Sequence, residues 1–167
     1  MIADQLSRGV ELSTEWSLSP KDFQQIRDLN PCLEVDQFST RLNHKLPTFI
    51  SPCEDSKATA VDALSTPWHQ WNHLYLFPPT TLIPKALAKL SSSPFKSAVL
   101  LTPETPTRPW YMSLSLRKVP SVLLEVFLQQ EVVGKLVIKP QPSLIRAWML
   151  SKHHFAENIH SAQKAPS

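Results

Sequence analysis

The chain has 167 residues, with 17 Lys and Arg, 14 Asp and Glu and a formal charge of +3, which fits one compact domain and excludes a multidomain enzyme. Hydrophobic residues make up 42% of the chain and charged residues 19%, so there is enough apolar material for a core. Only two glycines, Gly9 and Gly134, accompany 16 prolines. This excludes nucleotide binding through a G-x-G-x-x-G turn or a Walker loop, because both need several glycines.

The charge is unevenly spread: −4 over residues 1–36, +3 over residues 37–134 and +4 over residues 135–167. The basic C-terminal part fits either weak attraction to polyanions or an ordinary solvated surface. Cys32 and Cys53 form no C-x-x-C pair, no apolar signal core follows the N-terminus, and no apolar run approaches the ~20 residues of a membrane-spanning helix. We therefore expect a protein of the cytoplasm or nucleus with no membrane partner.

In chain order, the first predicted elements are two helices and two strands. Residues 2–8 have the pattern of one or two helical turns, ended by Gly9 at a position that glycine favours. A serine N-cap, a proline at the first helical position and one apolar face predict a helix over residues 20–29. Short apolar runs broken by proline then predict strands at residues 34–38 and 47–50.

The middle of the chain predicts a βαβ unit. Residues 74–77 and 96–102 have the composition of buried strands, and residues 81–90 between them carry a helical stripe that tolerates Pro84 in its first turn. Strand, helix and strand at this spacing predict two parallel strands. The expected fold class is therefore α/β, with a small, mostly parallel sheet and flanking helices.

After the βαβ unit, the pattern predicts a short helix over residues 110–116. Two strands, at residues 121–128 and 135–138, are expected to meet around Gly134 as a hairpin. The spacing of apolar side chains over residues 143–155 predicts a C-terminal helix.

Motifs in a fixed order resemble one known family. They include Val35-Asp36-Gln37-Phe38-Ser39, Ala60-Val61-Asp62-Ala63-Leu64, Leu74 to Pro79 and Val99-Leu100-Leu101-Thr102-Pro103. Over residues 34–117 they look like the segment that follows ribonuclease H in polyproteins of tyrosine-recombinase retrotransposons of the DIRS and Ngaro type. That segment is itself similar to phage Dam-like adenine methyltransferases. Residues 2–8 resemble the closing helix of the ribonuclease H, and residues 144–151 resemble the segment before the recombinase.

The resemblance implies four parts. Residues 1–14 would be a remnant of the ribonuclease H closing helix, and residues 15–33 a linker helix. Residues 34–130 would form a Dam-like α/β domain with a Rossmann-like, methyltransferase-type sheet, and residues 131–167 a hairpin strand with a C-terminal helical tail. Asp4 would match a metal ligand of ribonuclease H, but that reaction needs three or four carboxylates around two metal ions, so we expect no metal site and no such activity.

The resemblance places the methyltransferase loop at Phe77-Pro78-Pro79-Thr80. In Dam-like enzymes, the first loop residue and the carbonyl after it accept hydrogen bonds from the adenine amino group, and the last residue stacks on the flipped base. Phe77 cannot accept a hydrogen bond from an amine, and Thr80 has no aromatic face. Because one such contact is worth about 3–4 kcal/mol in the transition state, we expect methyl transfer to be slight at most.

The part of the sequence that would bind the cofactor also departs from the family's pattern. The family binds S-adenosylmethionine, but the usual glycine-rich turn after the first strand is replaced here by Ser39-Thr40-Arg41-Leu42-Asn43. Asp36 and Asp62 would bind a ribose or amino group if the cofactor were taken up, and would otherwise be solvated or salt-bridged acids. We expect no cofactor.

Three functions are consistent with these patterns. The first is a non-catalytic fragment of a retrotransposon polyprotein, with a structural or nucleic-acid-contact role beside its reverse transcriptase and ribonuclease H. The second is an active adenine methyltransferase that uses S-adenosylmethionine, in which Thr80 or a neighbour supplies the missing polar contact. The third is a module that binds DNA, RNA or another polyanion through five cations: Lys85, Lys89, Arg108, Arg117 and Lys118.

Overall fold

The computed structural model describes residues 16–39, 43–132 and 134–155. Its helices are α2 (Pro20–Leu29), α3 (Ile83–Ser92) and α4 (Pro109–Leu116), and the 3₁₀ turn η1 (Thr80–Leu82) leads directly into α3. The predicted helix over residues 2–8 lies outside the described residues. The helix predicted over residues 20–29 is confirmed, and its Ser19 side chain accepts a hydrogen bond of 3.1 Å from the Asp22 N–H.

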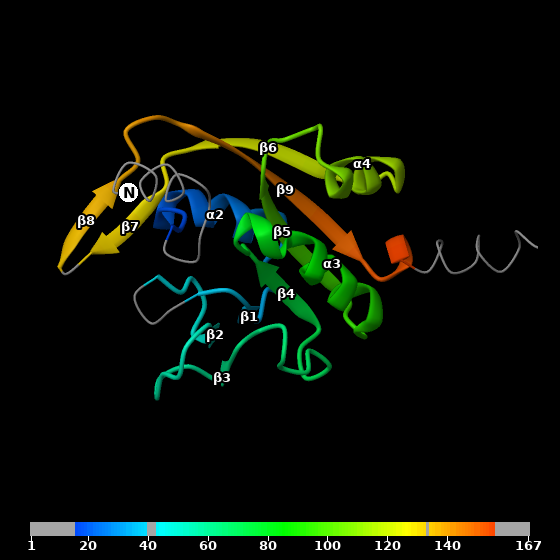
Figure 1. Ribbon diagram of the computed structural model, residues 1–167, viewed down its shortest axis with the longest axis horizontal. Coiled ribbons are helices and arrows are strands. Elements are labelled where there is room, and N and C mark those ends of the chain that lie inside the picture. Colours follow the sequence, from blue (N-terminus) through cyan, green and yellow to red (C-terminus); the bar gives the residue numbers. More distant parts are fainter. Residues whose placement is uncertain (1–15, 40–42, 133, 156–167) are drawn as a thin grey trace, which may run out of the picture.

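Seven strands of the described chain form one sheet, in the spatial order β3-β2-β1-β4-β5-β9-β6 (Figure 1). Neighbours from β3 to β5 are parallel, while β9 runs antiparallel to β5 and to β6. This is the doubly wound order 3-2-1-4-5-6 with one antiparallel strand inserted before the last. The predicted α/β fold class, with a mostly parallel Rossmann-like sheet, is confirmed. The strands are β1 (Val35–Asp36), β2 (Thr48–Ser51), β3 (Ala60–Val61), β4 (His73–Leu76), β5 (Ser97–Pro103), β6 (Ser121–Val126) and β9 (Ser143–Ser151).

The predicted βαβ unit is also confirmed. β4 and β5 are parallel neighbours, with Leu74 opposite Ala98, and α3 joins them. Loops at residues 37–47, 52–59 and 62–72 make the other parallel connections, from β1 through β2 and β3 to β4, and contain no helix in their described parts. Such connections usually take about a dozen residues or more and a helix. In the described chain, the β1–β3 half of the sheet is therefore connected by loops rather than by crossover helices.

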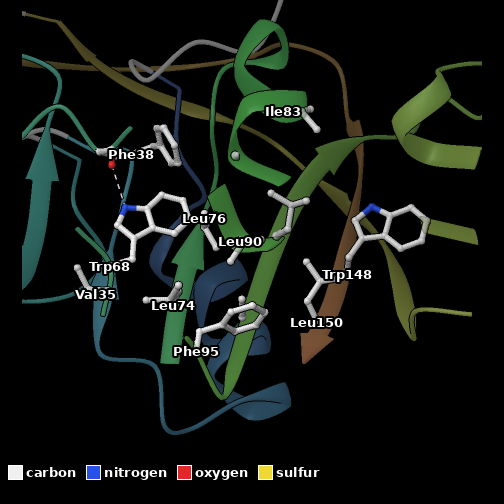
Figure 2. Close-up of a cluster of buried hydrophobic side chains, with 14 of the residues drawn as sticks. Val35, Phe38, Trp68, Leu74, Leu76, Ile83, Leu90, Phe95, Trp148 and Leu150 are labelled. Atoms are coloured by element: carbon white, nitrogen blue, oxygen red, sulfur yellow. Dashed lines mark hydrogen bonds between the residues drawn. The ribbon is translucent and has the colours of Figure 1, made fainter. Parts of the chain in front are cut away.

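The central strands β4, β5 and β9 are buried on both faces, because their side chains alternate between two cores. On β4, Leu74 and Leu76 face the core under α3 and α4, whereas Tyr75 faces the core under α2. Helix α2 thus covers one face, and α3 and α4 cover the other (Figure 1). In the α3 core, Trp68 and Trp148 lie on either side of the aliphatic side chains of β4, β5 and α3 (Figure 2).

The predicted helix over residues 143–155 is wrong for residues 143–151, which form β9. Ile145 and Ala147 lie in the α2 core, while Trp148 and Leu150 lie in the α3 core. Apolar side chains on both faces of a central strand imitate the spacing of a helical stripe, so periodicity alone does not separate the two. β9 lies between β5 and β6, so this segment is part of the main sheet.

The predicted hairpin has the right turn but the wrong first strand. Around Gly134, which has φ +77°, β8 (Lys135–Ile138) pairs with β7 (Gln129–Val132) rather than with β6. The chain leaves the main sheet after Val126. Leu128, which follows, is fully buried in the α2 core, and its carbonyl accepts a hydrogen bond of 2.9 Å from the Lys139 N–H. β6 instead pairs with β9 along its whole length.

Candidate functional site

In an open parallel sheet, ligands bind beyond the carboxyl ends of the strands at the point where the strand order reverses. Here the order reverses between β1 and β4, which are parallel neighbours with Asp36 opposite Tyr75. The residues that follow these strands, 37–39 and 77–80, therefore line the place where a nucleotide-like cofactor would sit. We call this place the switch-point crevice.

Among the described residues, side chains fill the switch-point crevice. Its volume is about 10 Å³, and it is lined by Trp16, Ser17, Asp36, Phe38, Ser39, Asn43, Lys45, Tyr75 and Phe77. A space of this size holds about one water molecule.

Asp36, one of the two carboxylates that were predicted to bind the cofactor, is among the side chains that line the crevice. It is 2% exposed, and its Oδ2 accepts a hydrogen bond of 2.8 Å from the Lys45 N–H. Burial raises the pKa of Asp36 to about 6, against the opposing effects of the Lys45 N–H and the Ser39 hydroxyl. Asp36 Oδ1 and both polar atoms of the neighbouring Gln37 side chain have no hydrogen-bond partner among the described residues. The end of β1 thus carries a buried polar cluster that is only partly satisfied.

The predicted methyltransferase loop is split between two environments. Phe77 is 6% exposed and packs in the α2 core, and Pro78 is buried. Pro79 precedes η1, and Thr80, the first residue of that turn, faces an open pocket on the other side of the loop. The loop therefore lies at the ligand-facing edge of the sheet, as expected, but its first side chain points into the core.

Asp62 has a local structural role. It follows β3, is exposed and has φ +60°. Its Oδ1 accepts a hydrogen bond of 3.2 Å from the Leu64 N–H, and its Oδ2 accepts one of 2.8 Å from the Ser65 hydroxyl. These bonds close a turn, which is a common use of aspartate. Asp62 does not line the crevice that contains Asp36.

The open pocket, which we call the rim pocket, has a volume of about 1020 Å³ and lies beyond the carboxyl ends of β4 and β5. Its walls are η1 with the start of α3, the loop after β5 with the start of α4, and residues 139–145. Much of its lining is apolar, with Pro84, Leu87, Pro103, Pro109, Trp110 and Pro142. Its size and lining are typical of ligand sites.

The one carboxylate of the rim pocket is neutralised. Glu104 Oε2 lies 2.7 Å from Arg146 Nε, and the Tyr111 hydroxyl donates to Glu104 Oε1. Arg146 also donates to the Ser121 hydroxyl at 2.8 Å. Desolvation and the hydrogen bond to Glu104 raise the pKa of Tyr111. The charge balance of the pocket is therefore set by two cations, Arg108 and Lys139, which form no ion pair with any residue that the structure describes.

Of the five predicted cations, the structure places only Arg108 at the rim pocket. Lys89 donates to the Leu64 carbonyl at 2.8 Å and lies 5.3 Å from the centre of the Trp68 ring. Arg117 lies 5.4 Å from the centre of the Phe155 ring. Lys85 on α3 and Lys118 after α4 are exposed, away from the pocket lining.

Lys139 and Ser143 also line the rim pocket and were not predicted as site residues. The β7–β8 hairpin and the following loop bring both residues to the carboxyl end of β5. This path of the chain depends on residues 143–151 forming a strand, which their sequence pattern did not predict. The predicted Asp4 lies outside the described residues, and in the described part no group of three or more His, Cys, Asp and Glu side chains is arranged to hold a metal ion.

No helix in the described part of the chain is long and apolar enough to span a bilayer.

The sequence matches no protein-family model and, at a significant level, no curated protein. Among solved structures, the chain is similar to a domain from Corynebacterium diphtheriae described as a precorrin-6Y C5,15-methyltransferase. The identity is 12% and the TM-score 0.42, over 78% of this chain and 98% of that domain.

Proposed function

We propose that this chain is a non-catalytic, methyltransferase-like domain of a retrotransposon polyprotein, which contacts nucleic acid and does not transfer methyl groups. The retrotransposon origin rests on the ordered motifs between Val35 and Pro103. The loss of catalysis rests on one observation above all, that the switch-point crevice is closed while the rim pocket is open.

The residues at the switch point do not fit S-adenosylmethionine. This cofactor carries a purine, a ribose and an amino-acid chain, whereas the crevice has a volume of about 10 Å³. Phe38 and Phe77, both less than 10% exposed, line this small space. The chain also has no glycine between Gly9 and Gly134, so no bare backbone is present there for close approach of a ligand.

The alternative of an active adenine methyltransferase finds less support. Its loop would need a polar side chain in place of Phe77, which is buried in the α2 core. Thr80 is the remaining polar residue of the loop, and it faces the rim pocket, which does not share its lining with the crevice. A methyl donor and an adenine would therefore have no common space in which to react.

Contact with nucleic acid is supported by the cations around the rim pocket. Arg108 and Lys139 line the pocket, while Lys85 and Lys118 are exposed on the α3–α4 side of the sheet. A few cations of this kind favour weak, salt-dependent contact with phosphates rather than tight binding.

Methyl transfer is tested with isotopically labelled S-adenosylmethionine and adenine-containing DNA or RNA. We expect no incorporation of label. Incorporation above that of a heat-denatured sample would contradict the non-catalytic assignment and restore the enzyme alternative.

Nucleic-acid contact is tested by fluorescence anisotropy of a labelled single-stranded oligonucleotide. We expect the affinity to fall roughly tenfold or more between 50 and 200 mM salt, because two to three counterions are released. Arg108→Gln with Lys139→Gln should weaken binding, whereas Lys57→Gln, an exposed lysine in the β2–β3 loop, should not. Binding that is independent of salt and of the double change would argue against this role.

A further inference from the structure

The main sheet of the described chain ends in two unlike edge strands. At one edge, β3 has only two residues and is followed by the exposed Asp62. At the other edge, β6 has six residues and pairs with β9 in one continuous register. Short edge strands and charges prevent two sheets from joining, whereas a long and regular edge favours it. β6 is therefore the edge of this sheet that is suited to pairing with another strand.

One row of backbone groups on β6 has no partner among the described residues. The Pro120 carbonyl accepts a hydrogen bond of 2.8 Å from the Met149 N–H, so the ladder with β9 uses every second residue of β6 from this point on. The residues in between, Ser121, Leu123 and Glu125, direct their N–H and C=O groups away from β9. β6 contains no proline and no lysine that would protect this row.

The side chains of β6 define what an added strand must offer. Leu123 is 45% exposed and lies opposite Arg146 of β9, on the face that α3 and α4 cover. On the other face, Val122 is half-buried and Leu124 is buried in the α2 core. Glu125 is the one charged residue of β6 and forms no ion pair with any described residue. A fitting strand therefore places an apolar side chain opposite Leu123 and a hydrogen-bond donor opposite Glu125.

A second copy of β6 meets both requirements. Two antiparallel copies pair through their outward backbone groups when Leu123 lies opposite Leu123, which places Glu125 opposite Ser121 of the second copy. Arg146 Nη1 donates to Ser121 Oγ at 2.8 Å, while Arg146 Nε binds Glu104. The Ser121 hydroxyl proton is thus left to donate to the incoming carboxylate, with a cation beside it. The other register that pairs as many residues would place each Glu125 opposite a leucine.

We propose that β6 is a self-association edge, through which two copies of this chain form a twofold-symmetric dimer with one continuous sheet. In such a dimer one surface serves both subunits, which is the commonest arrangement in soluble oligomers. Val122 of each copy packs against Leu124 of the other, which extends the α2 core across the twofold axis. The pairing does not involve the switch-point crevice, so it stands apart from the non-catalytic assignment.

The test is sedimentation velocity of the full chain over about a hundredfold range of concentration. We expect a dimer that dissociates on dilution. Leu123→Lys brings two ammonium groups together at the twofold axis, so it should weaken dimerisation at least about tenfold. Because Leu123 is exposed in the single chain, circular dichroism should show an unchanged fold.

Leu136→Lys is the matched control, because Leu136 is 59% exposed on β8, outside the main sheet. This variant should dimerise like the wild type. A chain that is monomeric throughout, a Leu123→Lys variant that dimerises like the wild type, or a loss of the dimer with Leu136→Lys would overturn the proposal.

The register is tested by cross-linking with a short bis-maleimide, in a background in which Cys32 and Cys53, both exposed, are changed to serine. Leu123→Cys should give a cross-linked dimer, since the two side chains meet at the twofold axis. Glu125→Cys should not, because its copies lie opposite Ser121 and not opposite each other. Equal cross-linking of the two variants, or none in either, would contradict pairing through β6.

Discussion

At the residue scale, Asp36 is enclosed by its own chain rather than open to a ligand. A carboxylate at the end of the first parallel strand is well placed to bind a ribose. The sequence therefore predicted Asp36 as a candidate cofactor ligand. In the structure the carboxyl is enclosed by its own chain, with the Lys45 N–H on one oxygen and none of the described residues on the other. Its burial is therefore a cost to the folded state whenever the group is ionised.

The pH dependence of stability should reveal this cost. The pKa of Asp36 rises from 3.8 to about 6 on folding, so the native state binds more protons than the unfolded state between these values. This group therefore lowers the free energy of unfolding as pH rises from about 4 to 6, by up to about 3 kcal/mol.

Asp36→Asn imitates the protonated form, so it should raise the free energy of unfolding at pH 7 and leave it nearly unchanged at pH 4. Urea unfolding at both values measures this. A variant that is less stable than the wild type at pH 7 would contradict the burial argument.

A second residue-scale prediction concerns the hydrogen bond between the Trp148 indole N–H and the Thr102 hydroxyl, 2.9 Å long, in which both side chains are at most 2% exposed. Thr102→Val keeps the shape but leaves a buried N–H unpaired, which should cost about 1–3 kcal/mol of stability. In a Trp148→Phe background the same change should cost less, because no indole N–H is left. Denaturant unfolding of the four proteins checks this, and additive effects would contradict a direct coupling.

The sequence could predict some site residues and not others. Phe77 and Thr80 were found because they stand in a recognisable motif, and both lie near the expected edge of the sheet. Lys139 and Ser143 belong to no motif, and they reach the rim pocket only through the path of the hairpin. When a distant segment of the chain folds back to a site, the residues that it contributes form no local sequence motif.

At the element scale, β9 is the element whose type was predicted wrongly. Elements with one buried face, such as α2, were predicted correctly, because their periodicity separates core from solvent. β9 is buried on both faces between β5 and β6, and its apolar residues therefore showed a false helical period.

The role of β9 leads to a prediction about truncation. A chain that ends at Gln141 lacks the strand that joins β5 to β6, and so exposes the apolar residues of both cores. We expect it not to unfold cooperatively, whereas a chain that ends at Phe155 should. Circular dichroism during thermal unfolding distinguishes the two. A cooperative transition in the shorter chain would show that the domain ends before β9.

At the scale of the whole molecule, the sheet has two unequal halves. The β4–β5 half keeps its crossover helix and a roomy pocket, whereas the β1–β3 half has short loops and a filled crevice. Composition, with two glycines and 16 prolines, already excluded phosphate-cradling glycine loops in the first half. The open pocket of the second half was not predictable, since its volume depends on how α3, α4 and residues 139–145 pack.

The most direct test of the proposed function is an amide NMR spectrum of the labelled full chain, titrated with S-adenosylmethionine. We predict that the cofactor leaves the resonances of Asp36 to Ser39 unchanged. Saturable shifts at Asp36 to Ser39 with S-adenosylmethionine would contradict it, because they would show that the crevice between β1 and β4 opens to a cofactor.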